Sequence, residues 1–245
     1  MSESEPIRVG TVLTLAGSVQ AELFAEAFDF IWVDLEHAAL SSADAQGMIL
    51  GAQAAGVAAM VRVRCDALAQ MIQVLDAGAD GIVLADVPDA TIAAAVISHV
   101  THPPAGTRGW GPRRSGTRGR HRRLGARRPQ VWAQIERANA VREAHNIAMV
   151  TGIDALVVGT ADLSLALGVP QQFDSTELIG AVSSVQRAAA ECGVEFGVAG
   201  PLTTAPLALT KGATILCHST DARIAAAAAD SAAETLRTRA REHSV

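Results

Sequence analysis

The chain has 245 residues, of which 49% are hydrophobic and 18% charged, and its formal net charge is −5. This length fits one large α/β domain better than two small ones, and the negative charge argues against a general nucleic-acid binder. The N-terminal MSESEPIRVG lacks the regions of a signal peptide, and no apolar run is long enough to cross a bilayer. We therefore expect a cytoplasmic protein with no membrane partner.

Short apolar runs alternate with longer alanine-rich stretches along the chain, a rhythm typical of βα units on a parallel sheet. The predicted strands are residues 9–15, 30–35, 57–63, 81–87, 130–136, 155–160, 195–200 and 213–219. The predicted helices are residues 18–28, 42–55, 66–77, 88–98, 137–150, 175–192, 202–210 and 220–241.

Eight alternations in this length predict a (β/α)₈ TIM barrel, an α/β fold, as a single domain over residues 1–245. A doubly wound open sheet is the alternative. No G-x-G-x-x-G follows the first strand, which weakens the dinucleotide-binding version of that alternative.

The fourth unit is followed by an irregular segment, residues 101–129, in which Gly, Pro and Arg replace any periodic apolar signal. Residues 113–128 hold eight arginines and no acid, so the rest of the chain carries a formal net charge of −13. We expect a long loop, and such loops in compact domains are usually functional or disordered.

The cysteines Cys65, Cys192 and Cys217 lie far apart without C-x-x-C spacing. This pattern supports neither a disulfide framework nor a structural zinc site, so we expect reduced thiols.

Charged residues gather where four of the predicted strands end, and the active sites of barrels lie at these carboxyl ends. They are Asp34, Glu36 and His37 after the second strand, Arg62 in the third, Glu136 after the fifth, and Asp162 after the sixth. Each alone is explained equally well as a structural charge paired with a neighbour. Removing so many ionisable groups from water at one end of the barrel costs free energy unless a ligand binds there. The pattern as a whole therefore favours a functional site.

Glu136 and Asp162 offer hard oxygen ligands, which favour Mg²⁺ or Mn²⁺, with Co²⁺ as a further option, over structural zinc. The only lysine, Lys211, precedes the eighth strand and therefore lies at the wrong end of the barrel. Schiff-base chemistry needs a lysine in the pocket, so the position of Lys211 argues against it.

Five segments occur in the order and near the spacing of the motifs of one enzyme family: FDFIWVDLEHA, VRV with LDAGADGIV, HPPAGTRGWG, QIE and VVGTADLSLALG. Through them the chain resembles the HpcH/HpaI aldolases, metal-dependent class II pyruvate aldolases that include 2-keto-3-deoxy sugar acid aldolases. The resemblance implies a carbon–carbon lyase that uses a pyruvate enolate and an aldehyde acceptor. It also implies a homo-oligomer, a hexamer in which the last helix, here residues 220–241, packs on a neighbouring subunit. An ordinary eighth barrel helix is the alternative for that segment.

The resemblance further implies the roles of individual residues. Glu136 and Asp162 would bind the divalent metal, which pyruvate chelates through its carboxylate and keto oxygens, and Arg62 would steady the enolate oxygen. His37 would be the acid–base group, acting through a water. Asp34 and Glu36 would order the water network around it. Contacts with pyruvate would come from Gln134 and from the backbone of Gly159, Thr160 and Ala161.

The chain departs from the family pattern in three places. Ala85-Asp86 stands where the family has Pro, so a carboxylate is expected to face the rim of the pocket, and Thr160 replaces the Pro of G-P-A-D-L-S. The segment after TRGWG is short and arginine-rich. It is interpreted either as a solvated loop or as a clamp for an anionic acceptor or a phosphorylated or CoA-bearing substrate.

Two other functions stay open at this point. One is an acyl-CoA lyase of the malyl- or citramalyl-CoA type, which shares the metal and enolate chemistry. The other is a non-catalytic barrel that binds an acidic partner or RNA through the arginine-rich loop.

Overall fold

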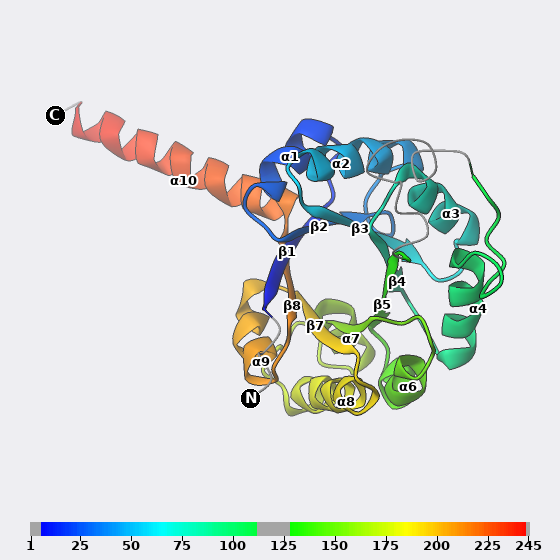
Figure 1. The fold of residues 1–245 in the computed structure, drawn as a ribbon. Helices are drawn as coiled ribbons and strands as arrows, with labels where there is room; N and C mark the ends of the chain where they lie inside the picture. Colours follow the sequence, from blue (N-terminus) through cyan, green and yellow to red (C-terminus); the bar gives the residue numbers. More distant parts are fainter. Residues whose placement is uncertain (1–5, 112–127, 244–245) are drawn as a thin grey trace.

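The computed structural model describes residues 6–111 and 128–243, and in it eight parallel strands close into a barrel in the order β1 to β8 (Figure 1). The strands are β1 Arg8–Leu13, β2 Phe30–Asp34, β3 Ala58–Arg64, β4 Gly81–Ala85, β5 Gln130–Ile135, β6 Ala155–Gly159, β7 Glu195–Gly200 and β8 Ile215–Thr220. Pairing of β8 with β1 closes the barrel. The predicted TIM barrel is confirmed, and the open-sheet alternative is wrong.

The helices lie around the outside of the barrel (Figure 1). They are α1 Ser18–Ala25, α2 Ser42–Ala54, α3 Leu68–Ala77, α4 Ala90–Val100, α6 Ala138–Ala148, α7 Thr160–Ala166, α8 Thr176–Cys192, η2 Leu202–Thr204, α9 Ala205–Thr210 and α10 Asp221–Glu242. The sequence did not predict α7, because the apolar run of β6 continues directly into it and Gly159 at its start provides no side-chain cap. None of the helices within the described residues is both long and apolar enough to span a membrane.

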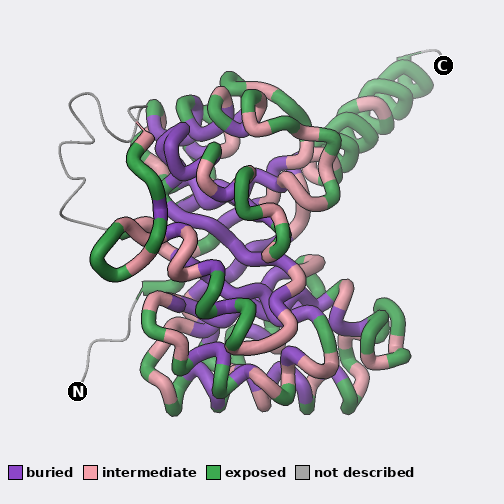
Figure 2. Tube along the Cα trace, turned by 90° about the vertical axis from the view of Figure 1, so that its right-hand side faces the viewer, coloured by how far each residue is buried: buried purple, intermediate pink, exposed green. Residues whose placement is uncertain are grey.

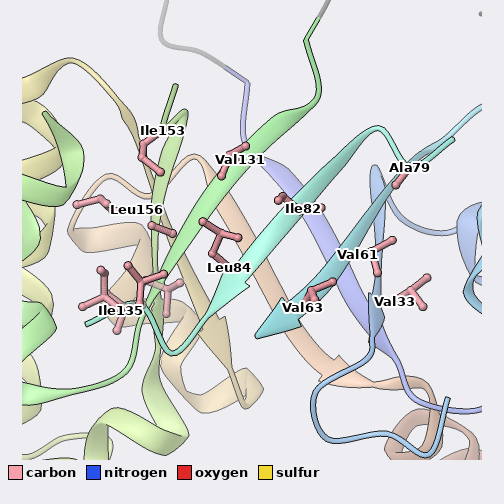
Figure 3. Packing of buried hydrophobic residues seen from close by; sticks show 14 of the residues in the cluster. Val33, Val61, Val63, Ala79, Ile82, Leu84, Val131, Ile135, Ile153 and Leu156 are labelled. Atoms are coloured by element: carbon pink, nitrogen blue, oxygen red, sulfur yellow. The ribbon is translucent and has the colours of Figure 1, made fainter. Parts of the chain in front are cut away.

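Strand alternation divides the core into two layers. One layer lies between the strands and the helices and includes Val33, Val61, Ile82, Leu84, Val131 and Leu156 (Figure 3). The other fills the barrel interior with Phe30, Trp32, Met60, Val83, Trp132, Val157, Ile215 and Cys217. The strands that carry both layers are the most buried part of the chain (Figure 2).

Aromatic rings form the floor of the barrel. Trp132 packs edge-on against Phe30, with 5.2 Å between the ring centroids, and against Trp32 at 6.4 Å. The guanidinium of Arg8 lies 5.4 Å from the centroid of Trp132. These large side chains close the lower half of the barrel, so an internal site is left only above them.

Helix α10 leaves the barrel instead of packing on it (Figure 1). Of its 22 residues only Asp221 is buried. The ring of helices is open at β8 and β1, between α9 and α1, where α10 projects away (Figure 1), although Leu13 and Leu216 on these strands are buried. Exposed apolar side chains flank this opening, namely Val9, Val19, Leu23 and Leu209. Helix α10 begins and ends one residue after the predicted segment 220–241, and its exposed side chains argue against the alternative that it covers its own strand.

The irregular segment is described only at its two ends. At its start, Arg108 donates from Nη2 to Oδ1 of Asp76 at 2.6 Å in a buried ion pair, and the exposed Trp110 packs on the ring of His102. At its end, Arg128 pairs with Asp154. The arginine-rich part of the segment, residues 113–127, lies outside the described residues.

Candidate active site

Alternation in the inner layer carries polar residues to the mouth of the barrel. The inward positions Phe30 and Trp32 are followed by Asp34, and the inward Met60 is followed by Arg62. Asp34 and Arg62 are also register partners on neighbouring strands. The lower inward positions of these strands are apolar and the upper ones are charged. The charged side chains therefore lie together above the aromatic floor.

Asp34 and Arg62 form a buried bidentate ion pair. Arg62 donates from Nε to Oδ1 at 2.9 Å and from Nη2 to Oδ2 at 2.8 Å, and the backbone N–H of Glu36 donates to Oδ1 at 3.0 Å. Burial alone would raise the pKa of Asp34, but the hydrogen bonds and charge of Arg62 and the backbone donors together hold it below its ordinary value. The guanidinium also lies 5.7 Å from the Trp32 ring. Arg62 is thus a fixed positive charge.

Glu36 is a second carboxylate beside Arg62, but its surroundings favour the ionised form less than those of Asp34 do. Its Oε2 lies 3.4 Å from Nε of Arg62 and 3.6 Å from Nε2 of His37. Burial raises the pKa of Glu36 despite Arg62 and His37, with Asp34 and Asp162 adding to the increase. Oε2 is buried and has no hydrogen-bond partner in the described part of the chain. His37 itself lies at the rim, with its side chain 60% exposed.

Glu136 is the most perturbed acid of the site. It is 6% exposed, and burial together with the charges of Glu36 and Asp162 raises its pKa to about 8 against the influence of Arg62. Gln134 donates from Nε2 to its Oε1 at 2.5 Å, and the backbone N–H of Asp86 donates to its Oε2 at 3.2 Å. These two donors fix the carboxylate without neutralising it.

Gly159 makes room for this pair at the end of β6. A Cβ at this position would lie 2.7 Å from both Gln134 Nε2 and Glu136 Oε1, closer than such atoms approach. Thr160 follows with a buried side chain that donates from Oγ1 to the carbonyl of Ala199 at 3.1 Å, so only its backbone is available to the site. Ala161 is exposed in the first turn of α7.

The polar residues surround one cavity of about 430 Å³ at the mouth of the barrel. It is lined by Glu36, His37, Arg64, Asp86, Glu136, Arg137, Asp162, Leu165 and Ala166. The structure thus brings together the charged ends of β2, β5 and β6 that the sequence singled out, while Asp34, Arg62 and Gln134 support them from within the barrel. Asp86 faces the cavity as expected from its replacement of a proline.

Arg64 and Arg137 were missed as cavity residues. The position of Arg64 carries a signal that could have found it, because it continues the inward series of Met60 and Arg62. Arg137 follows Glu136 directly and lies beyond the end of β5, where alternation no longer predicts which way a side chain faces.

The donors present fit a divalent cation. No group of three His, Cys, Asp or Glu side chains with metal-binding geometry occurs in residues 6–111 and 128–243. Mg²⁺ is usually held by one or two carboxylates together with substrate and water oxygens, so Glu136 and Asp162 are sufficient. Oε2 of Glu36 and Oε1 of Gln134 are buried and have no hydrogen-bond partner within the described residues, and the pKa of Glu136 is raised, so these oxygens are suited to a cation.

Comparisons with known proteins agree with this chemistry. A family model described as HpcH/HpaI aldolase/citrate lyase matches residues 15–228. A 4-hydroxy-4-methyl-2-oxoglutarate aldolase of Chaetomium globosum is 34% identical over 199 residues, covering 77% of this chain and 74% of that protein. A 4-hydroxy-2-oxovalerate aldolase of Rhodococcus jostii is 35% identical over 201 residues, covering 80% and 78%. The crystal structure of a HpcH/HpaI aldolase/citrate lyase family protein from Burkholderia cenocepacia superposes with a TM-score of 0.87 at 27% identity, covering 95% of both chains.

Proposed function

The chain belongs to the HpcH/HpaI aldolase/citrate lyase family, and from this premise we propose that it is a divalent-metal-dependent aldolase acting through a pyruvate enolate. The observation that carries the proposal is the buried Glu136, whose pKa is raised to about 8 beside two further carboxylates and above a fixed guanidinium. Such an arrangement is costly for an empty protein and suited to a cation and an anionic substrate.

Glu136 and Asp162 would hold the metal, with Mg²⁺ or Mn²⁺ preferred and Co²⁺ acceptable to the same oxygen donors. When bound, the ion would supply Lewis-acid stabilisation of the enolate charge. Gln134 orients Glu136 through its 2.5 Å hydrogen bond, and the close approach of Gly159 fixes both side chains. Gln134 Oε1 and the backbone of Gly159, Thr160 and Ala161 would contact the pyruvate.

Arg62 would stabilise the enolate oxygen. Its bidentate pair with Asp34 fixes the plane of the guanidinium before substrate arrives, and a preorganised donor costs no reorientation in the transition state. Asp34 therefore acts as a positioning residue for Arg62.

His37 would move the proton through a water molecule. The exposed imidazole sits at the rim with Glu36 on one side, and its backbone N–H donates to Oδ1 of Asp34 at 3.4 Å. An imidazole can both give and take protons near neutral pH. Glu36 and Asp34 would order the water that lies between His37 and the substrate.

The proposed substrates are pyruvate or another 2-oxo acid as donor and a small carbonyl compound, an aldehyde in the first instance, as acceptor. The relatives described above are aldolases of hydroxylated 2-oxo acids, which supports this choice over an acyl-CoA lyase. A cytoplasmic location stays a prediction.

We also propose that the protein is a homo-oligomer, a hexamer by family resemblance, in which α10 packs on a neighbouring subunit. A protruding 22-residue helix and the exposed apolar side chains Val9, Val19, Leu23 and Leu209 in the same chain support this exchange. Light scattering of the full chain and of a chain ending at residue 220 tests it. A full chain that is monomeric at micromolar concentration would refute it.

The proposed function is tested by exchange of the pyruvate methyl protons in D₂O, followed by NMR with Mg²⁺ and after treatment with EDTA. We expect exchange that needs the metal and is lost in Glu136→Gln and strongly reduced in His37→Ala. The matched control is Glu26→Gln, which changes an exposed carboxylate at the end of α1. Absence of exchange in folded, metal-loaded protein would refute the pyruvate enolate.

A further inference from the structure

We propose that Arg64 and Arg137 select the acceptor, by binding an anionic group at the end of the acceptor that is remote from the new carbon–carbon bond. This inference rests on the proposed aldolase function and adds a substrate class to it: carbonyl compounds that carry a carboxylate or a phosphate. The two arginines and Asp86 between them are called the rim triad below.

The rim triad comes from three neighbouring strands. Arg64 is the last residue of β3, Asp86 follows the last residue of β4, and Arg137 follows Glu136 beyond β5. Ala85 is the register partner of Arg64. All three side chains line the cavity that also holds Glu136 and Asp162. They therefore lie on one arc of its wall.

The rim triad lies one layer above the proposed donor site. Arg62 and Arg64 are both inward positions of β3, and two residues along a strand advance it by about 6.6 Å. Burial follows the same order, since the side chain of Arg62 is 11% exposed whereas those of Arg64 and Arg137 are 46% and 57% exposed. A substrate that places its 2-oxo acid end at Arg62 would reach the rim triad with the far end of a short carbon chain.

Asp86 holds Arg137 in place and lies within ion-pair distance of Arg64. Arg137 donates from Nη2 to its Oδ2 at 2.8 Å and also from Nε to its Oδ1, and Nη1 of Arg64 lies 3.5 Å from Oδ2. Asp86 adopts a φ of +59°, which residues with a side chain rarely do. A guanidinium has five N–H donors, so the two bonds to Asp86 leave Arg137 three for a ligand.

Stability alone gives little reason for this arrangement. Arg64 donates from Nε and Nη2 to Oδ1 and Oδ2 of Asp66 at 3.1 and 3.0 Å, which leaves its Nη1 for a ligand beside Asp86, and exposed ion pairs of this kind contribute little to folding. Asp86 is the less accessible partner, with its side chain 17% exposed, so an anion entering from solvent meets the guanidinium groups first. A planar guanidinium fixed by one carboxylate is well suited to bind a second anion.

The test compares acceptors of similar length in the Mg²⁺-dependent addition of pyruvate: succinic semialdehyde with a carboxylate, glyceraldehyde 3-phosphate with a phosphate, and neutral butanal. The measured quantity is the ratio of kcat/KM for each anionic acceptor to that for butanal. We expect at least one ratio to exceed ten in the wild type. The charge-removing variants Arg64→Gln and Arg137→Gln should each lower that ratio about 10- to 100-fold.

Two further variants separate selection from a structural effect. Arg142→Gln, an exposed arginine on α6, is the matched control and should leave the ratio unchanged. Arg137→Lys keeps the charge but loses the fork that pairs with Asp86, so it should restore part of the ratio lost in Arg137→Gln. A variant that merely folds badly would lower kcat/KM for all acceptors together.

Ratios near one in the wild type, or ratios unchanged by removing both arginines, would overturn the inference. Exchange of the pyruvate methyl protons, measured on the same samples, separates this failure from that of the proposed function. With exchange present and no anionic preference, only the acceptor selection is refuted. With exchange absent, the aldolase proposal fails and the selection fails with it.

Discussion

Glu136→Gln is expected to stabilise the metal-free protein at alkaline pH. Glu136 is buried beside other carboxylates, which raises its pKa from 4.5 to about 8. Each pKa unit corresponds to about 1.4 kcal/mol, so ionising this group in the folded state costs roughly 5 kcal/mol. The neutral amide has nearly the same shape and does not ionise. The variant therefore avoids this cost.

The sign of the pH dependence follows from proton counting. Below pH 4.5 the carboxyl is protonated in both the folded and the unfolded state. Between 4.5 and about 8 the folded state keeps a proton that the unfolded state has released, so the free energy of unfolding falls as the pH rises. Above 8 both states are ionised and the loss is complete. Glu36, whose pKa is also raised by burial, adds a loss of the same sign.

Urea denaturation in EDTA at pH 5, 6, 7, 8 and 9 measures this effect in the wild type, in Glu136→Gln and in the control Glu26→Gln. The wild type should lose stability over this range, the control should follow it, and Glu136→Gln should show a clearly flatter profile. Adding Mg²⁺ should stabilise the wild type more at pH 8 than at pH 6, because the metal binds the ionised carboxylate. Parallel pH profiles for the wild type and Glu136→Gln would refute the reasoning.

Two other substitutions test the supports of the site, and a third tests a contact between α10 and the backbone that follows β1. Gly159→Ala should displace the side chains of Gln134 and Glu136 and so lower kcat roughly 100-fold. Circular dichroism should show an intact barrel. Unchanged kinetics would contradict the close approach of these side chains to Gly159. Asp34→Asn should lower the free energy of unfolding, measured by urea denaturation, by about 3 kcal/mol, because it leaves Arg62 buried beside a neutral amide. A loss under about 1 kcal/mol would show that Arg62 finds another partner. Asp221→Ala should lower the free energy of unfolding by about 3 kcal/mol, because it removes the acceptor of the backbone N–H groups of residues 14 and 15. A smaller loss would mean that water replaces the carboxylate.

Much of the barrel could be predicted because each strand repeats a simple physical pattern. The eight apolar runs mark the strands, and the charges that follow them mark the mouth. Glu36 and Glu136 could be predicted in this way, since a carboxylate directly after a buried strand rarely belongs to the core. Helix α7 could not, because no cap or polar break separates it from β6.

The rim triad shows a different limit of prediction from the sequence. Arg64 continues the inward series of β3, so alternation could have placed it, whereas Arg137 lies beyond the end of β5 and cannot be distinguished in the sequence from an ordinary surface arginine. Asp86, which pairs with Arg137, adopts a φ of +59° that the sequence does not predict. The arginine-rich residues 113–127 attract attention in the sequence but lie outside the described residues, and the charges of the rim triad all come from the described part of the chain.

The aromatic floor has a kinetic consequence. Phe30, Trp32 and Trp132 close the barrel below the site, so ligands come and go through the mouth alone. The donor position beside Arg62 lies beneath the rim, and an acceptor bound at the rim obstructs it. Synthesis should therefore follow a compulsory order in which the 2-oxo acid binds first, and cleavage should release it last. Product-inhibition patterns measure this order, and random order would show that the mouth admits both ligands independently.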